Sequence, residues 1–253
     1  MYLCVRGSPY SRAYNLTNLD MRARWIQECV DAVKEGCTGC FIDQANLQEM
    51  IAGNTAAGRA YSRAHLETLV QLNQQLAQMG TFSINNHLGD QGDHVVAMMI
   101  EDFAGSEKCI NMLRTISGYG FIVEAHAGNE PANYSCANGG TNSLAAFLIG
   151  MGNYSYYHCQ GPPFTWVAQG GWPNVPADEA LDWLPEYEYK LGRPLGDATT
   201  RPSSTGENAS VWSRSFDSGT RVEFDGGNGN GTIWWSNGPV QVGGPTSSDP
   251  TVV

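Results

Sequence analysis

Short apolar runs that alternate with amphipathic segments dominate residues 1–190 of this 253-residue chain. Five of the runs are expected to form strands, over residues 38–42, 81–84, 95–100, 121–123 and 154–157. Helices cover both faces of a parallel sheet, so its strands consist almost entirely of apolar residues, as these runs do. The alternation therefore predicts an α/β fold built from parallel β/α units.

The segments between the runs have the spacing of amphipathic helices. Ile26, Cys29, Val30 and Val33 recur at intervals of three and four residues, which places them on one face of a helix over residues 21–33. Three further helices are expected, over residues 66–77, 106–117 and 144–149.

The number and character of the strands predict the domain organisation. With residues 2–5 taken as another strand, the count is about six, whereas a closed (β/α)8 barrel has eight. We predict an incomplete (β/α)8-type barrel of about six units over residues 1–190. Beyond it Pro, Gly, Ser and Thr dominate, and short runs indicate antiparallel strands over residues 211–216, 220–224 and 232–235. We predict a small antiparallel β-domain over 191–240 and a disordered tail over 241–253.

The charge of the chain restricts its partners. It has 25 acidic and 14 basic residues, and its net charge is -11. A protein that binds a nucleic-acid backbone needs a surplus of Lys and Arg, which this chain lacks. No apolar run approaches the roughly 18 residues that a membrane span needs. We expect neither a nucleic-acid nor a membrane partner, and the oligomeric state stays open.

Acidic residues follow three of the expected strands directly: Asp43, Glu101 and Glu124. In parallel β/α folds the active site lies at the carboxyl ends of the strands. A single acidic residue there could equally cap the next helix, but three in succession favour a catalytic role. Glycoside hydrolysis needs two carboxyl groups beside one bond. We predict Asp43 and Glu101 as this pair, with Glu124 in reserve.

Other polar and aromatic residues near strand ends are candidates for substrate binding. The residues expected to hydrogen-bond sugar hydroxyls or to stack on sugar rings are Asn85, Asn86, His87, His126, Tyr157, Trp166 and Trp172. For any one aromatic residue, packing in the core or in a loop is the commoner role.

Histidines near strand ends raise the alternative of a metal site. His87, His94, His126 and His158 could join Asp43, as in barrel amidohydrolases. The HxH pair that such enzymes carry on their first strand is absent, so we expect no metal and no cofactor.

Cysteines and glycosylation sequons bear on the compartment. The chain has seven cysteines and five Asn-x-Ser/Thr sequons, at Asn15, Asn133, Asn153, Asn208 and Asn230. Cys136 and Cys159 are expected to pair if the chain is exported. We interpret the Cys37–Cys40 spacing as part of an apolar strand, in which Cys is a small hydrophobic residue. We expect a secreted protein, although residues 1–6 do not have the pattern of a leader peptide.

A series of segments carries a resemblance to a known family. These are Tyr14-Asn15-Leu16-Thr17-Asn18 with Arg22 and Trp25, then Gly36-Cys37-Thr38-Gly39-Cys40-Phe41-Ile42-Asp43, residues 96–103, 145–157 and 187–196, and Trp212-Ser213-Arg214-Ser215-Phe216. Together they resemble a family of glycoside hydrolases with a TIM-barrel catalytic domain and a small C-terminal β-domain. The resemblance runs over about residues 14–236, and Thr38 stands where the family usually has Asp.

The resemblance implies roles for two carboxylates. It places the start of this chain near the third barrel strand, so the first two β/α units are expected to be absent. In α-galactosidase-like and α-glucosidase-like barrels, the Asp that closes the fourth strand is the nucleophile and the acid comes from the sixth. Asp43 and Glu101 would occupy these places.

We therefore expect a secreted glycoside hydrolase that acts on an oligo- or polysaccharide. The alternatives are a catalytically inactive carbohydrate-binding relative and a metal-dependent barrel hydrolase. The separation of the two carboxyl groups would indicate retention at about 5 Å or inversion at about 6.5–9.5 Å.

Overall fold

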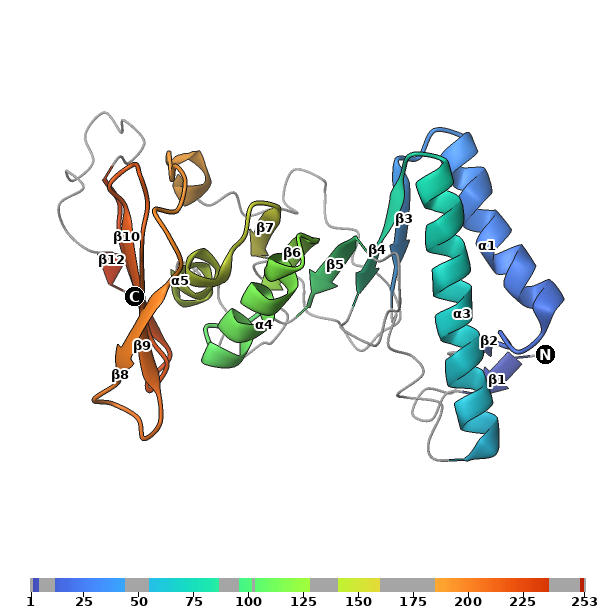
Figure 1. Ribbon diagram of the computed structural model, residues 1–253, viewed down its shortest axis with the longest axis horizontal. Coiled ribbons are helices and arrows are strands. Elements are labelled where there is room, and N and C mark those ends of the chain that lie inside the picture. The colour runs from blue at the N-terminus through green and yellow to red at the C-terminus, as the bar shows by residue number, and fades with distance from the viewer. Residues whose placement is uncertain are drawn as a thin grey trace, which may run out of the picture. The chain divides into compact units, whose positions relative to one another are not determined.

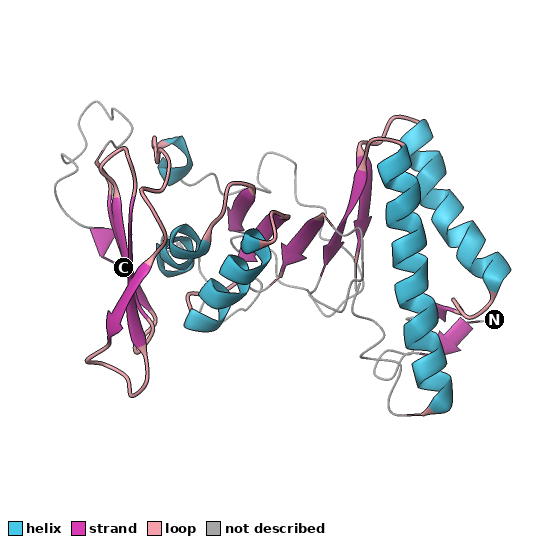
Figure 2. Ribbon diagram, in the orientation of Figure 1, coloured by secondary structure: helices cyan, strands magenta, loops and turns pink. Residues whose placement is uncertain are grey.

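The computed structural model describes residues 2–4, 12–43, 55–86, 96–101, 103–127, 141–159, 185–236 and 251–252. The chain divides into two compact units, Met1–Ile100 and Glu101–Val253. Helices alternate with strands through the first unit (Figure 2).

The first unit contains the expected alternation of helices and parallel strands. Its elements are α1 (Leu19–Lys34), β3 (Gly39–Ile42), α3 (Ala56–Gln78), β4 (Phe82–Asn86) and β5 (Ala97–Ile100). β3 pairs in parallel with β4, and β4 with β5. The predicted elements are confirmed, but α3 begins ten residues earlier than the apolar spacing indicated.

Side-chain caps explain where the two helices begin. Asn18 Oδ1 accepts hydrogen bonds from the backbone amides of Asp20 and Met21 at the start of α1. Thr55 Oγ1 accepts one from the amide of Gly58 at the start of α3. Such caps satisfy amides that have no partner within a helix. The inward face of the first turns of α3 consists of small and polar residues with Tyr61, so the large apolar residues of the sequence did not mark it.

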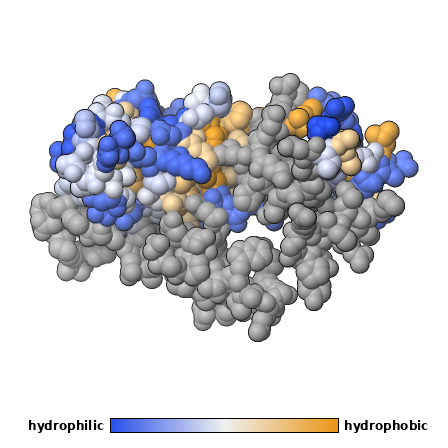
Figure 3. Space-filling view, turned by 90° about the horizontal axis from the view of Figure 1, so that it is seen from below, coloured by the Kyte–Doolittle hydropathy of each residue, from blue (hydrophilic) through white to orange (hydrophobic). Residues whose placement is uncertain are grey.

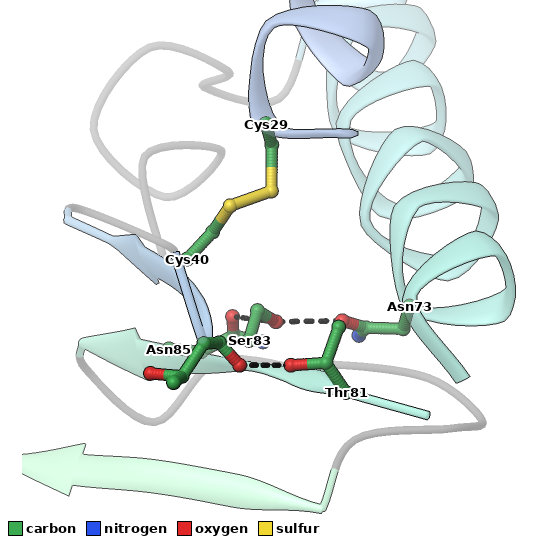
Figure 4. Close-up of a disulfide and its surroundings, with 7 residues drawn as sticks. Cys29, Cys40, Asn73, Thr81, Ser83 and Asn85 are labelled. Carbon is green, nitrogen blue, oxygen red and sulfur yellow. Dashed lines mark hydrogen bonds between the residues drawn. A yellow bond between two sulfur atoms is a disulfide. The ribbon is translucent and has the colours of Figure 1, made fainter. Parts of the chain in front are cut away.

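Helices α1 and α3 lie side by side (Figure 1), with α1 packed on β3 and α3 on β4. Their shared core contains Ile26 and Val30 from α1, Leu69, Leu72 and Leu76 from α3, and Ile42 from β3. Figure 4 shows the disulfide between Cys29 of α1 and Cys40 of β3, whose Cα atoms are 6.2 Å apart. The interpretation of Cys40 as a small hydrophobic residue is therefore wrong. The pairing depends on where a helix packs on a strand, which the Cys37–Cys40 spacing does not reveal.

The first strand of the chain is not a unit of the parallel sheet. β1 (Tyr2–Cys4) pairs antiparallel with β2 (Arg12–Tyr14). The connection over residues 5–11 is shorter than the crossover of about a dozen residues that parallel strands need. The prediction that residues 2–5 form a sixth parallel strand is therefore wrong.

The second unit contains two further parallel strands with their helices. Its elements are α4 (Glu107–Gly118), β6 (Ile122–Ala127), α5 (Thr141–Gly150) and β7 (Ser155–Cys159). β6 pairs in parallel with β7. In the first unit the strands therefore have the order β3-β4-β5, and in the second β6 neighbours β7. Five parallel strands are present in the described part of the chain, against the expected six.

An antiparallel sheet follows, as expected, after a short 3-10 helix, η2 (Pro185–Glu188). Its strands are β8 (Thr199–Pro202), β9 (Ser210–Ser215), β10 (Arg221–Asp225), β11 (Asn230–Trp234) and β12 (Thr251–Val252), in the order β12-β11-β10-β9-β8. β8 has no apolar signature because all four of its residues are exposed. Within the tail that was expected to be disordered, the structure describes only β12, which pairs with β11.

The antiparallel sheet is joined to α4 and α5 within the second unit. Glu107 Oε1 accepts hydrogen bonds from the amide of Ser210, at 2.9 Å, and from Trp212 Nε1, at 2.7 Å. Asn142 Oδ1 of α5 accepts one from the amide of Gly231, at 2.7 Å. The sheet thus forms one compact body with these helices.

On the face drawn in Figure 3 the described residues are mostly hydrophilic, with smaller hydrophobic areas between them. None of the described helices combines the length and the hydropathy that crossing a membrane requires.

Candidate active site

The pleat of β6 and β7 sorts their side chains onto two faces. On one face Val123, Ala125 and Ala127 are almost completely buried. Tyr157 is the partner of Ala125 in the neighbouring strand. The hydroxyl oxygen of Tyr157 lies 2.6 Å from Ser143 Oγ of α5. Because side chains alternate along a strand, this is the face that α5 covers.

Four other side chains belong to the opposite face. Glu124 is paired with Tyr156 across the two strands, and His126 with His158. The two imidazole rings are 5.2 Å apart between centroids and tilted by 42°. Tyr156 is 60% exposed, whereas the other three are half-buried. A carboxylate, two imidazoles and an aromatic ring therefore share the face that lies away from α5.

The electrostatic environment favours a neutral imidazole at His158. Burial lowers the pKa of His158, and the nearby His126 lowers this pKa further. A neutral imidazole has one hydrogen-bond donor and one acceptor, which suits a sugar hydroxyl. Burial raises the pKa of Tyr157, so its phenol stays protonated beside Ser143.

In the first unit, a buried amide holds Asp43. Asp43 follows the last residue of β3 and is exposed. Asn86, at the end of β4 and only 2% exposed, donates from Nδ2 to Asp43 Oδ1 at 2.8 Å. Asn86, which was expected to bind substrate hydroxyls, thus contacts the carboxylate that follows the neighbouring strand.

Asn85 belongs to the other face of β4. It is fully buried, and its Oδ1 lies 3.0 Å from Ser83 Oγ. Ser83 Oγ also lies 2.6 Å from Asn73 Oδ1 of α3, so this network joins β4 to its covering helix (Figure 4). Successive residues of a strand point to opposite faces, which separates Asn85 from Asn86. Asn85 thus has a structural contact in place of the expected contact with substrate.

The remaining two carboxylates differ in their relation to the strands. Glu101 follows β5 directly, as expected, and is half-buried. Glu124 lies within β6, because that strand continues to Ala127. The sequence suggested an earlier end since Glu124 and His126 interrupt the apolar run. Glu124 and His126 both belong to the face of β6 that α5 does not cover.

A family model for hypothetical glycosyl hydrolase family 15 matches residues 4–220. The chain belongs to this family. Two solved structures are similar, the glycoside hydrolase domain of PelA from Pseudomonas aeruginosa and a variant of that domain. Each is 18% identical, has a TM-score of 0.47, and aligns over 64% of this chain and 68% of that chain. The likeness to PelA is too distant to indicate an activity. No curated protein matches this chain.

Two residues of the glycosyl hydrolase motif near the N-terminus have structural roles. Asn18 caps α1. Arg22 of α1 is buried, donates to the carbonyl oxygen of Leu16, and forms an ion pair at 2.9 Å with Glu67 of α3. This part of the motif holds α1 against α3, and these contacts involve no candidate catalytic group.

Some predicted site residues lie outside the described residues, namely His87, His94, Trp166 and Trp172. Within the ranges that the structure describes, no group of three or more His, Cys, Asp or Glu residues could hold a metal ion.

Tyr156 was missed by the sequence analysis, and Tyr157 was expected in its place. Tyr157 packs against Phe147 of α5, with ring centroids 5.2 Å apart, and contacts Tyr187 of η2. Its contacts are therefore on the helix side of β7. Because Val123 and Ala125 are apolar, the alternation of side chains along β6 would have placed Glu124 on the opposite face. That Tyr156 lies beside Glu124 follows only from the register of β6 and β7.

Proposed function

We propose that this member of the glycosyl hydrolase family is a glycosidase that cleaves an oligo- or polysaccharide with Asp43 and Glu101 as its carboxylate pair. The observation that carries the proposal is the hydrogen bond from buried Asn86 to Asp43. A carboxylate must be held in a fixed orientation to act on a glycosidic bond. A rigid strand end with a buried amide donor provides that orientation.

Glu101 is the proposed acid and Glu124 the alternative. Glu101 directly follows a strand whose four residues are all buried, so its backbone is firmly placed. Glu124 shares its strand face with His126 and Tyr156. This environment suits a residue that binds sugar hydroxyls as well as one that transfers a proton. We assign proton transfer to Glu101 and substrate binding to Glu124.

Sugar recognition is assigned to the cross-strand group of Tyr156, His126 and His158. The exposed ring of Tyr156 offers a flat apolar surface for the C–H face of a sugar. The imidazoles supply directional hydrogen bonds. Asn86, at the end of β4, contributes indirectly by holding Asp43.

Export from the cell is proposed together with this activity. Cys29 pairs with Cys40, and Cys159 is also disulfide-bonded. The partner of Cys159 lies outside the residues whose side chains the structure describes. Disulfides persist in oxidising compartments and are rare in the cytosol.

The test is a matched pair of Asp→Asn substitutions assayed on a panel of polysaccharides. Reducing ends released by the wild-type chain identify the substrate. Asp43→Asn should then lower kcat by about 10³-fold or more, because a catalytic carboxylate is lost. Asp31→Asn removes an exposed carboxylate of α1 and should leave kcat unchanged.

The outcomes separate the proposal from its alternatives. Full activity of Asp43→Asn would remove Asp43 from the mechanism. A wild-type chain that binds a polysaccharide but releases no reducing ends would be a carbohydrate-binding relative. Loss of activity with a chelator would indicate a metal-dependent hydrolase.

A further inference from the structure

A cavity of about 530 Å³ lies in the second unit, away from the candidate catalytic residues. It is lined by the C-terminal ends of α4 and α5, by residues before β8, and by Arg214 of β9. α4 leads into β6 and α5 leads into β7, so the cavity lies at the amino ends of these strands. Catalytic groups of β/α folds gather at the carboxyl ends. The cavity is therefore separate from the proposed catalytic centre.

Arg214 lines this cavity in a fixed position. Its Nη1 donates to the carbonyl oxygens of Leu148, Ile149 and Met151, at 3.2, 3.1 and 2.7 Å, and its Nε donates to that of Gly196. These bonds cap the C-terminus of α5, where a positive charge is favourable. The guanidinium is thus immobilised before any ligand arrives.

Arg114 is the second cation that lines the cavity. Its guanidinium lies 5.1 Å from the centre of the Trp212 ring, and Trp212 is itself held by its bond to Glu107. Stacking on an aromatic face orients a guanidinium and leaves its edge available for hydrogen bonds. Both arginines are therefore preorganised.

The two cations are only partly compensated. Burial lowers the pKa of Arg214, Asp197 counteracts this, and the charge of Arg114 lowers the pKa further. Asp197 is the single carboxylate among the residues that line the cavity. A bound anion would relieve the repulsion between the guanidiniums, and arginine is well suited to carboxylates.

Neutral polar groups complete the lining. Asn111 of α4 and Asn153, before β7, bring side-chain amides that can donate and accept hydrogen bonds. We propose that this cavity binds a sugar that carries a carboxylate, of the uronic acid class, with the carboxylate at Arg114 and Arg214 and the hydroxyls at the two amides. The volume lies within the range of about 300–1,000 Å³ that small-ligand pockets have.

The proposal is tested by titrating the full 253-residue chain with sodium glucuronate and measuring the ligand-induced rise in Tm by calorimetry. Glucose, which lacks the carboxylate, and sodium acetate, which lacks the hydroxyls, are run at the same concentration and ionic strength. Glucuronate should raise Tm, and neither control should match it, since binding to the folded state alone stabilises it. No rise with glucuronate, or an equal rise with acetate, would overturn the proposal.

Three variants locate the site. Arg114→Gln should weaken glucuronate binding by about tenfold or more, because one of two charge-assisted contacts is lost. Asp197→Asn should strengthen it by about threefold to tenfold, because a repelling carboxylate is removed. Arg201→Gln, which alters a cation paired with Glu223 outside the cavity, should change nothing.

The Asp197 variant is decisive if Arg114→Gln fails to fold, because Asp197 is exposed. Unchanged affinity in that variant would place the bound sugar elsewhere. The result is independent of the proposed hydrolysis, since Asp43→Asn should bind glucuronate as the wild type does.

Discussion

Glu101 and Glu124 can be distinguished by what each contributes to bond cleavage. A general acid protonates the leaving group, so its loss matters little when the leaving group needs no proton. Glu101→Gln should lose activity on the natural polysaccharide by about 10²-fold or more but retain most of it on an aryl glycoside with an acidic phenol. The measurement is the ratio of kcat/KM on the two substrates.

Glu124→Gln provides the matched comparison. A residue that binds hydroxyls should lose activity on both substrates in proportion, mainly through KM. If Glu124→Gln shows selective retention on the aryl glycoside and Glu101→Gln does not, the roles of the two carboxylates are exchanged.

His65 of α3 makes the stability of the fold depend on pH. The side chain is 5% exposed and stacks on Tyr61, and burial lowers its pKa to about 4. Between pH 6.5 and 4 the unfolded chain binds a proton at this position that the folded chain does not. The free energy of unfolding should therefore fall as the pH falls through this window, by about 2 kcal/mol between pH 6.5 and pH 5.

The check is urea unfolding of the wild type and of His65→Gln at pH 7 and pH 5. The variant should lose most of this pH dependence, even if its stability at pH 7 is lower. An unchanged slope in His65→Gln would mean that other groups cause the effect.

Among the elements, the disulfide joins helix α1 to strand β3. Cys29 and Cys40 are separated by 11 positions, and the cross-link restricts the unfolded chain. The Cys29→Ala/Cys40→Ala double variant should lose about 2–3 kcal/mol of unfolding free energy relative to the oxidised wild type. Cys37 is a free, exposed thiol, so Cys37→Ser is the control and should keep the stability of the wild type.

Two results would contradict this assignment. The double variant could be as stable as the oxidised wild type in urea. Alternatively, a reducing agent could leave wild-type stability unchanged.

At the scale of the second unit, Glu107 links the antiparallel sheet to helix α4. Its Oε1 accepts from both the Ser210 amide and Trp212 Nε1. Glu107→Ala would leave two donors without their acceptor and should lower the unfolding free energy of this unit by about 1–3 kcal/mol. Glu207→Ala, at an exposed position, should have little effect. Urea unfolding followed by tryptophan fluorescence measures both, and equal stabilities of the two variants would contradict the link.

Periodicity was enough to predict the α/β class, because burial on one or two faces leaves a direct pattern in the residues. It located α1, α4 and α5 and every parallel strand from β3 to β7. The exposed strand β8 had no such pattern and was missed. Asp43 became a candidate because a polar residue directly after an apolar run is easily recognised in the sequence.

Contacts between elements were decided only by the tertiary structure. The sequence shows Asn85 and Asn86 as equivalent neighbours, and both are buried, but Asn85 lies beside Ser83 whereas Asn86 holds Asp43. It gives no sign that Cys29 meets Cys40, or that Arg114 and Arg214 line one cavity. Local spacing sets how a segment folds and which of its faces is apolar. Which distant segment a helix or strand contacts depends on how the whole chain packs. The proposed chemistry depends on those contacts.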